Sequence, residues 1–293
     1  MNRLRVLSPG LLTTVQDLGR FGWAHHGVSA SGAADVVALR VGNLLVGNAE
    51  NAPGLEMTLA GAELEFEGPA VIAVTGSDFG AAVPIWTAVE VAGGTRLSFG
   101  RTRAGARAYV ALRGGLKARK IMGSASMHVA TGVGGRPLRA GDLLEIGKEA
   151  VRKPRPGPWR PPEADGPIRV TTGPQADRFG DELYAAAYTV TEESNRMGLR
   201  LRGPAIPSPP GGMLTEGTAL GAIQVPPNGQ PIILFVEHQT TGGYPKPANV
   251  ISADFTRLGQ LRPREEVRFE LITIERALQL LREQERWIYA LMR

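Results

Sequence analysis

Residues 13–22 read TTVQDLGRFG, and residues 171–180 read TTGPQADRFG, so one short segment recurs in the second half of the chain. A glutamate also recurs, since Glu56 precedes an apolar stretch in the first half and Glu216 precedes one in the second. These matches follow the same order in both halves, which indicates two copies of a β-rich domain of about 130 residues. The alternative is chance similarity between glycine-rich turns. Because matching positions in a duplication usually serve structure, both glutamates are expected to be scaffold residues.

Short apolar stretches that end at glycine or proline make up most of the chain, which contains 38 glycines and 22 prolines. Residues 62–67, AELEFE, alternate strictly, so Leu64 and Phe66 share one buried face. The continuous apolar stretches at 71–74 and 232–236 are typical of strands buried on both faces. Many short strands at close spacing predict a mainly β fold, either a barrel or a sandwich.

Helices are few, and three segments carry a helical pattern. Residues 33–45 place their apolar side chains on one stripe and are followed by a Gly-Asn pair that is typical of a helix end. Pro174 is suited to the first turn of a second helix that would extend to Ala187. Residues 273–292 have an amphipathic pattern, which most often packs on its own domain and less often binds a partner.

A proline-rich segment divides the chain almost in half. Residues 147–167 contain six prolines, which make a stiff, extended connector. The sequence therefore predicts a first domain at 1–150, a linker at 151–167 and a second domain with a C-terminal helix at 168–293.

The composition excludes several classes of protein. The chain has 293 residues, and 43% of them are hydrophobic, which suffices for a folded core. It has no cysteine, which excludes disulfides, thiol nucleophiles and iron–sulfur clusters and fits a reducing cytoplasm. No apolar run approaches the ~20 residues of a membrane span, and the first residues do not form a signal peptide. We therefore expect a cytoplasmic protein with no membrane partner.

The charge distribution and the absence of several motifs argue against further classes of protein. The formal net charge is +5, but the basic residues are scattered and do not interleave with aromatic ones, so nucleic-acid binding is not expected. The chain has no Gly-x-x-x-x-Gly-Lys-Ser/Thr phosphate loop and no Gly-x-Ser-x-Gly nucleophile elbow. Of its four histidines only His25 and His26 are close in sequence, so no metal site is expected.

The segment QTTGGYPK at 239–246 is the strongest candidate for a binding site. Its two glycines allow the backbone to approach a ligand closely, and its hydroxyl groups and phenol suit an anionic or carbonyl-bearing small molecule. Lys246, the only lysine after residue 153, is placed to counter charge that develops on an oxygen. The alternative is a polar hairpin with a chance lysine.

Two other polar segments are weaker candidates. In ESNRMG at 193–198, Asn195 offers an amide and Arg196 a guanidinium suited to a carboxylate or phosphate, although a capped turn explains the segment equally well. In the first half, Arg20 and Asp35 are candidates for binding, but a salt bridge or a helix cap explains them as well.

Together these motifs resemble one protein family. They are TVQDLGR at 14–20, SNRMG at 194–198 and QTTGGYP at 239–245, and the resemblance extends over nearly the whole chain. The sequence is similar to the KipA family, also called the 5-oxoprolinase C subunit, allophanate hydrolase subunit 2 or the biotin-dependent carboxyltransferase family. The resemblance implies a mainly β fold of two tandem cyclophilin-like β-barrel domains with a few helices.

The resemblance also implies a function and partners. It implies the C subunit of a bacterial 5-oxoprolinase, which takes part in ATP-dependent hydrolysis of 5-oxo-L-proline to L-glutamate with a KipI-like B subunit and with the A subunit of 5-oxoprolinase. ATP is then expected to be shared with the partner subunits, since this chain has no phosphate loop. One alternative is the carboxyltransferase subunit of a urea-carboxylase-like system, which uses biotin. Another is a non-catalytic KipA-like regulator that binds a KipI-like protein.

Candidate roles follow from the matching segments. As catalytic residues we expect Lys246, Glu237 and Tyr244. As substrate-binding residues we expect Asn195, Arg196, Gln239, Thr240, Thr241, Gly242, Gly243, Arg20 and Asp35. Two departures from the family pattern leave the substrate open, because Glu237 stands where aspartate is usual and Pro247 follows Lys246 where an aliphatic residue is usual.

Overall fold

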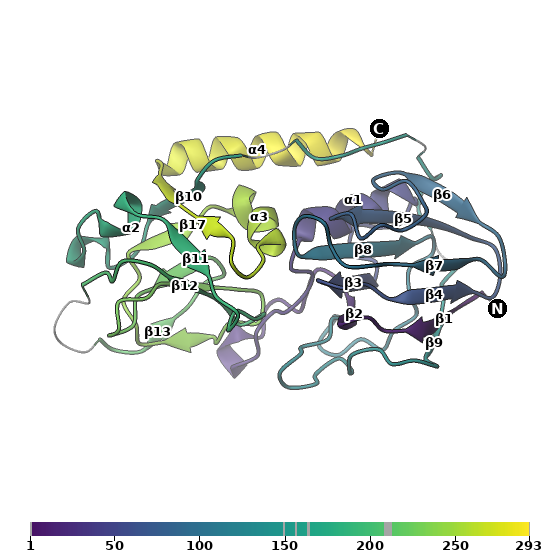
Figure 1. The fold of residues 1–293 in the computed structure, drawn as a ribbon, viewed down its shortest axis with the longest axis horizontal. Coiled ribbons are helices and arrows are strands. Elements are labelled where there is room, and N and C mark those ends of the chain that lie inside the picture. Colours follow the sequence, from purple (N-terminus) through teal and green to yellow (C-terminus); the bar gives the residue numbers. More distant parts are fainter. Residues whose placement is uncertain (1, 149, 156, 163–164, 208–212, 293) are drawn as a thin grey trace. The chain divides into compact units, whose positions relative to one another are not determined.

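The computed structural model describes residues 2–148, 150–155, 157–162, 165–207 and 213–292. Helices hold 16% of the residues and strands hold 28%, so the predicted mainly β class is confirmed (Figure 1). The strands are short and the connections between them are long, as the glycine and proline content indicates.

The chain forms two compact units. Unit 1 comprises Met1–Arg20, Ser31–Pro162 and Ile288–Arg293, and unit 2 comprises Phe21–Ala30 and Glu163–Trp287. The segment 21–30 therefore groups with the second half of the chain, although it lies inside the first predicted domain. The predicted boundaries at 1–150, 151–167 and 168–293 stay predictions, as does the internal repeat.

Unit 1 contains two antiparallel sheets. The first has the order β7-β4-β1-β9 and consists of β1 (Arg3–Ser8), β4 (Glu63–Phe66), β7 (Arg96–Ser98) and β9 (Leu143–Glu145). The second has the order β2-β3-β8-β5-β6 and consists of β2 (Leu12–Gln16), β3 (Gly54–Thr58), β5 (Ala70–Gly76), β6 (Ala88–Val91) and β8 (Arg107–Leu112). The alternating stretch at 62–67 corresponds to β4, and its Leu64 and Phe66 are fully buried as predicted.

One hydrophobic core holds both sheets of unit 1 together. Leu4 of β1 and Phe66 of β4 belong to the same buried cluster as Leu55 of β3, Ile72 of β5 and Val110 of β8. Each fully buried aliphatic or aromatic side chain contributes about 1.5–3 kcal/mol relative to its exposed state. The core therefore fixes which face of each strand points inward.

Helix α1 (Val36–Leu45) lies against β5 and β8 of unit 1 (Figure 1). It begins later than the predicted 33–45, because the Asp35 carboxylate accepts a hydrogen bond from the Ala38 N–H at 2.9 Å and caps the first turn. The candidate Asp35 thus serves as a helix cap, which is the alternative that the sequence leaves open.

A buried network holds the start of α1 to the sheet. Glu56 accepts hydrogen bonds from the Tyr109 hydroxyl at 2.7 Å and from the Ala34 N–H at 2.8 Å, and is 1% exposed. Burial, together with the charges of Glu56 and Asp35, raises the pKa of Tyr109 well above its usual value. Glu56 therefore has the scaffold role that the sequence predicts for it.

Unit 2 is built on an eight-stranded sheet that is nearly closed into a barrel, with the order β18-β11-β12-β15-β14-β17-β10-β19. Its strands are β10 (Ile168–Thr172), β11 (Tyr188–Val190), β12 (Gly198–Arg202), β14 (Ala222–Gln224), β15 (Ile232–Leu234), β17 (Ala248–Val250), β18 (Glu266–Val267) and β19 (Phe269–Leu271). The two edge strands, β18 and β19, are separated in sequence by Arg268 alone, so the two ends of the sheet meet there.

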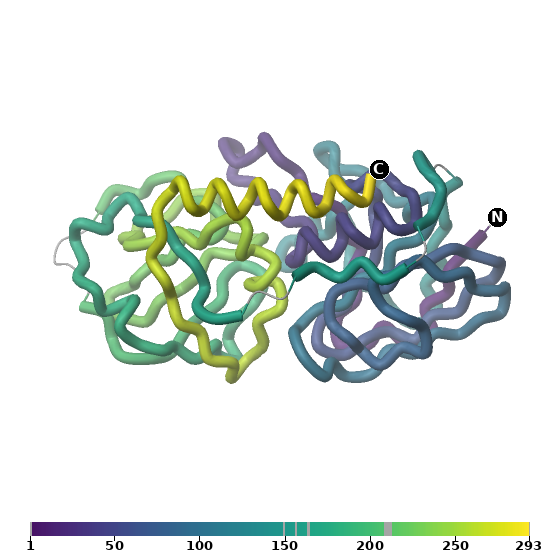
Figure 2. The backbone as a smooth tube through the Cα atoms, turned by 90° about the horizontal axis from the view of Figure 1, so that it is seen from above, coloured from purple at the N-terminus to yellow at the C-terminus, as the bar shows by residue number. Residues whose placement is uncertain are grey.

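A two-stranded ribbon and short helices complete unit 2. The ribbon pairs β13 (Glu216–Gly217) with β16 (Thr241–Gly242). The helical segments are η1 (Ala24–His26), η2 (Ala176–Arg178), α2 (Glu182–Ala185), η3 (Ser252–Asp254), α3 (Phe255–Gln260) and the longer α4 (Ile274–Ala290), whose residues from Ile288 onward group with unit 1. Helix α4 follows β19 as one straight helix, close to the predicted 273–292 (Figure 2).

The predicted helix from Pro174 to Ala187 is wrong. The structure has only the short helices η2 and α2 there, and Phe179 between them is extended. Gly180 follows Phe179, and glycine in a helix interior costs about 1 kcal/mol relative to alanine. The apolar side chains at helical spacing do not offset this cost, so one continuous helix does not form.

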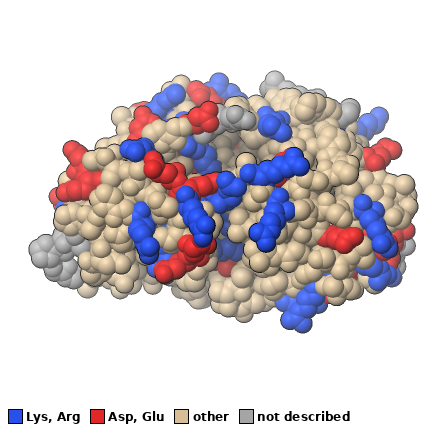
Figure 3. Space-filling view, in the orientation of Figure 1, with Lys and Arg blue, Asp and Glu red and all other residues tan. Residues whose placement is uncertain are grey.

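Basic and acidic side chains lie next to one another on the face drawn in Figure 3. The exposed ion pairs of the chain include Arg264–Glu192 and Arg268–Glu266. No helix in the described part of the chain is both long enough and apolar enough to span a bilayer.

Candidate functional site

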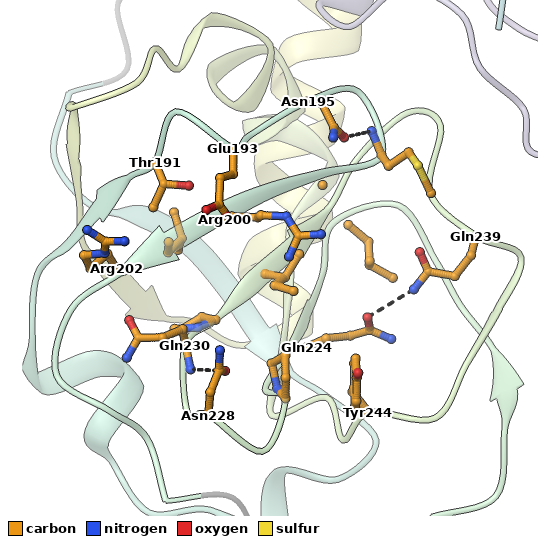
Figure 4. Close-up of a pocket in the computed structure, with 17 residues that line it drawn as sticks. Thr191, Glu193, Asn195, Arg200, Arg202, Gln224, Asn228, Gln230, Gln239 and Tyr244 are labelled. Carbon is orange, nitrogen blue, oxygen red and sulfur yellow. Dashed lines mark hydrogen bonds between the residues drawn. The ribbon is translucent and has the colours of Figure 1, made fainter. Parts of the chain in front are cut away.

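A cavity of about 580 Å³ lies within unit 2, beside β12, β15 and β14 (Figure 4). Its volume is within the range of small-molecule sites, about 300–1,000 Å³. Two of the segments singled out in the sequence reach it, because Asn195 from the first and Gln239 and Tyr244 from the second all line the cavity. The structure thus brings these three candidate residues together.

The floor of the cavity is a row of side chains across three strands. Arg200 of β12 stands opposite Ile232 of β15, and Ile232 stands opposite Gln224 of β14. Side chains at directly paired positions point to the same face of a sheet, so Arg200 and Gln224 lie on the two sides of the apolar Ile232. Gly198 makes room for this floor, because a Cβ there would approach Ile232 Cγ2 to 2.9 Å.

Two glutamine amides meet at one end of this row. Gln239 Nε2 donates to Gln224 Oε1 at 3.2 Å (Figure 4). Gln224 is 1% exposed, and its Nε2 has no hydrogen-bond partner among the described residues. A buried donor without a partner costs about 1–3 kcal/mol, and a rotation of the Gln224 amide toward the cavity would let a ligand oxygen relieve that cost.

The loop between β11 and β12 is held in shape by its own hydrogen bonds. Asn195 Oδ1 accepts from the Met197 N–H at 2.8 Å, and Ser194 Oγ accepts from the Arg200 N–H at 3.0 Å. Within the described ranges nothing accepts a hydrogen bond from the Asn195 side-chain NH₂, so its donors are available to a ligand. Thr191, in the same loop, also lines the cavity, but its Oγ1 is buried and lacks a partner among the described residues.

A buried ion pair joins the two candidate segments. Arg196 Nε lies 2.5 Å from Glu237 Oε1, and the two side chains are 6% and 1% exposed. The backbone joins the same positions, because the Glu237 N–H donates to the Arg196 carbonyl at 2.8 Å. Neither residue lines the cavity. The pair therefore fixes how the two loops meet and does not itself reach the cavity.

Lys246 is not among the described residues that line the cavity, although its Nζ donates to the carbonyl of Tyr244 at 3.2 Å. Its Nζ lies 2.7 Å from Glu216 Oε1, and its side chain is 3% exposed. Gln175 completes the cluster, with its Nε2 donating to Glu216 at 3.0 Å and its Oε1 accepting from the Lys246 N–H at 3.0 Å. Hydrogen bonds from Lys246 and Gln175 lower the pKa of Glu216. This cluster attaches β13, and with it the β13–β16 ribbon, to the chain at Lys246.

His238 and Thr218 fix the other end of the ribbon. Thr218 donates to the Gln239 carbonyl through its hydroxyl, and His238 Nδ1 lies 2.7 Å from the same oxygen. Burial lowers the pKa of His238, although its hydrogen bond to Gln239 opposes the shift. A neutral imidazole with its proton on Nδ1 suits this contact.

Substitutions at Lys246 and Glu216 test whether Lys246 holds the ribbon in position or takes part in the reaction itself. If Lys246 acts by holding the ribbon, Lys246→Met and Glu216→Gln should lower kcat/KM by similar factors, and the double variant by no more than the larger single effect. Because the pKa of Glu216 is lower in the folded state than its usual 4.5, the stability it contributes is present above pH 4.5 and is lost as the pH falls through the folded-state value. The Tm difference between wild type and Glu216→Gln should therefore shrink as the pH falls. A Lys246→Met loss much larger than that of Glu216→Gln would instead assign Lys246 to the chemistry.

The remaining candidates do not line the cavity. Thr241 and Gly242 form β16, and Thr240 and Gly243 flank it. Arg20 belongs to unit 1, is 1% exposed and donates to the Ser126 carbonyl. Asp35, also of unit 1, caps α1.

Two residues of the site, Arg200 and Gln224, are not among those predicted from the sequence, and Arg202 lies beside Arg200 in the same strand. The stretch GLRLR at 198–202 alternates, which indicates a strand with both arginines on one face. A glutamine after Ala222 and Ile223 is a polar side chain in an apolar strand. Both signals are present in the sequence, but only the strand register shows that they meet.

Comparisons with known proteins match this arrangement to one family. The carboxyltransferase domain, subdomain A and B, matches residues 26–271. The chain is 37% identical to the 5-oxoprolinase C subunit of Escherichia coli (strain K12), over 97% of this chain and 96% of that protein. It is 36% identical to the protein of the same name from Haemophilus influenzae, over 93% and 92% of the two chains. The crystal structure of the K. lactis urea amidolyase is 30% identical with a TM-score of 0.91, covering 99% of this chain but 20% of that one.

Proposed function

Because the chain belongs to the carboxyltransferase domain family, subdomain A and B, we propose that it is the C subunit of a 5-oxoprolinase. In this proposal it takes part, with a KipI-like B subunit and with the A subunit of 5-oxoprolinase, in ATP-dependent hydrolysis of 5-oxo-L-proline to L-glutamate. Two relatives of nearly the same length that are named as the C subunit of 5-oxoprolinase support a role as one part of an enzyme complex.

The glutamine pair is the observation that carries the proposal. Its internal hydrogen bond uses one donor of Gln239 and the oxygen of Gln224. Gln224 Nε2 therefore remains as a donor, and the Gln239 amide oxygen remains as an acceptor. A lactam presents the complementary pair, a carbonyl that accepts and an N–H that donates. The cavity is thus suited to bind and orient a small cyclic amide over Ile232.

Tyr244 and Asn195 complete the lining around the amide. Tyr244 is 45% exposed, so its phenol is accessible at the edge of the cavity. Asn195 offers its side-chain NH₂ from the opposite loop. In the proposal these residues orient the substrate, whereas Glu237 and Lys246 act as positioning residues through Arg196 and Glu216.

ATP is assigned to the partner subunits. When bound by the assembly, ATP would supply the phosphoryl group that activates the lactam. The N-terminal end of helix α1 does not suit a phosphate. The Ala34 and Ala38 N–H groups donate to the carboxylates of Glu56 and Asp35. This negative charge opposes a bound anion, which supports placing ATP on the partner subunits.

The second candidate function is a carboxyltransferase subunit for a urea-like amide. It is favoured by the 0.91 TM-score to the urea amidolyase over 99% of this chain. Urea also carries a carbonyl and N–H groups, so the glutamine pair by itself fits both substrates. Biotin would then be supplied by another chain, which is the alternative that the sequence leaves open.

The assembled complex tests the proposal. Co-purified subunits should release glutamate from 5-oxoproline when ATP is present, and should not carboxylate urea in the presence of carboxybiotin. Carboxylation of urea without glutamate release would support the second candidate. Tight binding to a KipI-like protein with turnover of neither substrate would support the regulatory role.

A further inference from the structure

Arg200 carries a positive charge that is not needed to bind a neutral amide. It projects from β12 toward the middle of the cavity, whereas Arg202 lies at one side (Figure 4). Both side chains are exposed, and the structure gives neither guanidinium an ion pair within the described residues. Glu193 is the single carboxylate among the described lining residues, so the lining carries a net positive charge.

The register sets the distance between the charge and the amide site. Arg200 and Gln224 stand on either side of Ile232, two strand spacings apart, which is about 9–10 Å between backbones. Arg200 extends toward the middle of the cavity, whereas the Gln224 amide is turned toward Gln239 (Figure 4). A compact ligand with a lactam at one end and an oxyanion at the other spans this arrangement, with its ring carbons on the apolar floor.

We propose that Arg200 is a specificity-determining residue that binds a carboxylate attached to the amide substrate. This inference rests on the proposed function and names the feature that separates its two candidate substrates, because 5-oxoproline is an anion and urea is neutral. A guanidinium binds carboxylates through a planar fork of donors. Phosphate would use the same donors, so the experiment separates the two sources of an oxyanion.

Titration of the full chain with small ligands tests the proposal. Wild type should bind 5-oxoproline at least about tenfold more tightly than 2-pyrrolidinone, the same lactam without the carboxylate. Arg200→Gln should remove this preference by weakening 5-oxoproline and leaving 2-pyrrolidinone unchanged within about twofold. Arg202→Gln is the matched control, since it removes the same charge from the same face of the same strand and should keep most of the preference.

Several outcomes overturn the proposal. One is equal affinity of wild type for the two lactams, and another is a preference that survives Arg200→Gln. Absence of lactam binding also overturns it. Arg200-dependent binding of inorganic phosphate or ATP without a lactam preference would assign the charge to a nucleotide.

Failure of this inference is distinguishable from failure of the proposed function. If Arg200→Gln keeps the preference while the assembled complex still releases glutamate, the charge assignment alone fails. If the preference depends on Arg200 but the complex releases no glutamate, the proposed function alone fails.

Discussion

Gly242→Ala is expected to lower turnover of the amide substrate by about 100-fold, because misplacement of a binding group by about 1 Å costs this much. A Cβ at Gly242 would lie 2.6 Å from Gln224 Nε2 and 3.4 Å from Gln239 Nε2. Gln224 Nε2 is the end of a flexible side chain, so the amide can move, but it then leaves the place where the ligand carbonyl would bind. The change in free energy of unfolding should remain within about 1 kcal/mol.

Gly217→Ala is the matched control for this variant. Gly217 lies in the same ribbon, in the strand that pairs with β16, and a Cβ there has nothing within 4 Å. Its turnover should stay within about twofold of wild type, since no group at the cavity has to move. Equal losses in the two variants, measured as kcat/KM beside urea denaturation curves, would show that general disturbance of the ribbon and not the glutamine pair controls activity.

Glu237→Gln is expected to have the largest effect on stability. It removes the carboxylate 2.5 Å from Arg196 while the guanidinium stays buried. Breaking a buried pair on one side costs about 3–5 kcal/mol. The same substitution in the exposed pair, Glu192→Gln beside Arg264, should cost at most about 1 kcal/mol. Chemical denaturation of the three proteins measures the difference.

A double variant separates ion pairing from packing at this position. Arg196→Met with Glu237→Met removes both charges, so much of the lost stability should return. If Glu237→Gln is no more destabilising than Glu192→Gln, the pair does not hold the two loops together. If the double variant is as unstable as the single one, packing and not charge dominates there.

Local patterns predict the elements better than the way they join. The alternation at 62–67 identifies β4, and the stripe at 33–45 identifies α1 apart from its first residues. The stretch 266–271 has the pattern of a single strand, yet β18 pairs with β11 and β19 with β10. The closure of the sheet at Arg268 depends on strand partners that are far away in sequence, and a local hydrophobic pattern does not identify them.

The candidate site shows the same limit. Asn195, Gln239 and Tyr244 can be selected because polar side chains gather in short glycine-containing segments. Arg200 and Gln224 cannot be assigned to the same site from sequence alone, because their proximity arises from the register of β12, β15 and β14.

The most direct measurement is a crystal structure of the protein with 5-oxoproline bound. We expect the lactam carbonyl to lie within hydrogen-bond distance of Gln224 Nε2, the ring to lie on Ile232 and the carboxylate to bind the Arg200 guanidinium. A ligand bound elsewhere on the chain, with Gln224 Nε2 still without a partner, would contradict this expectation.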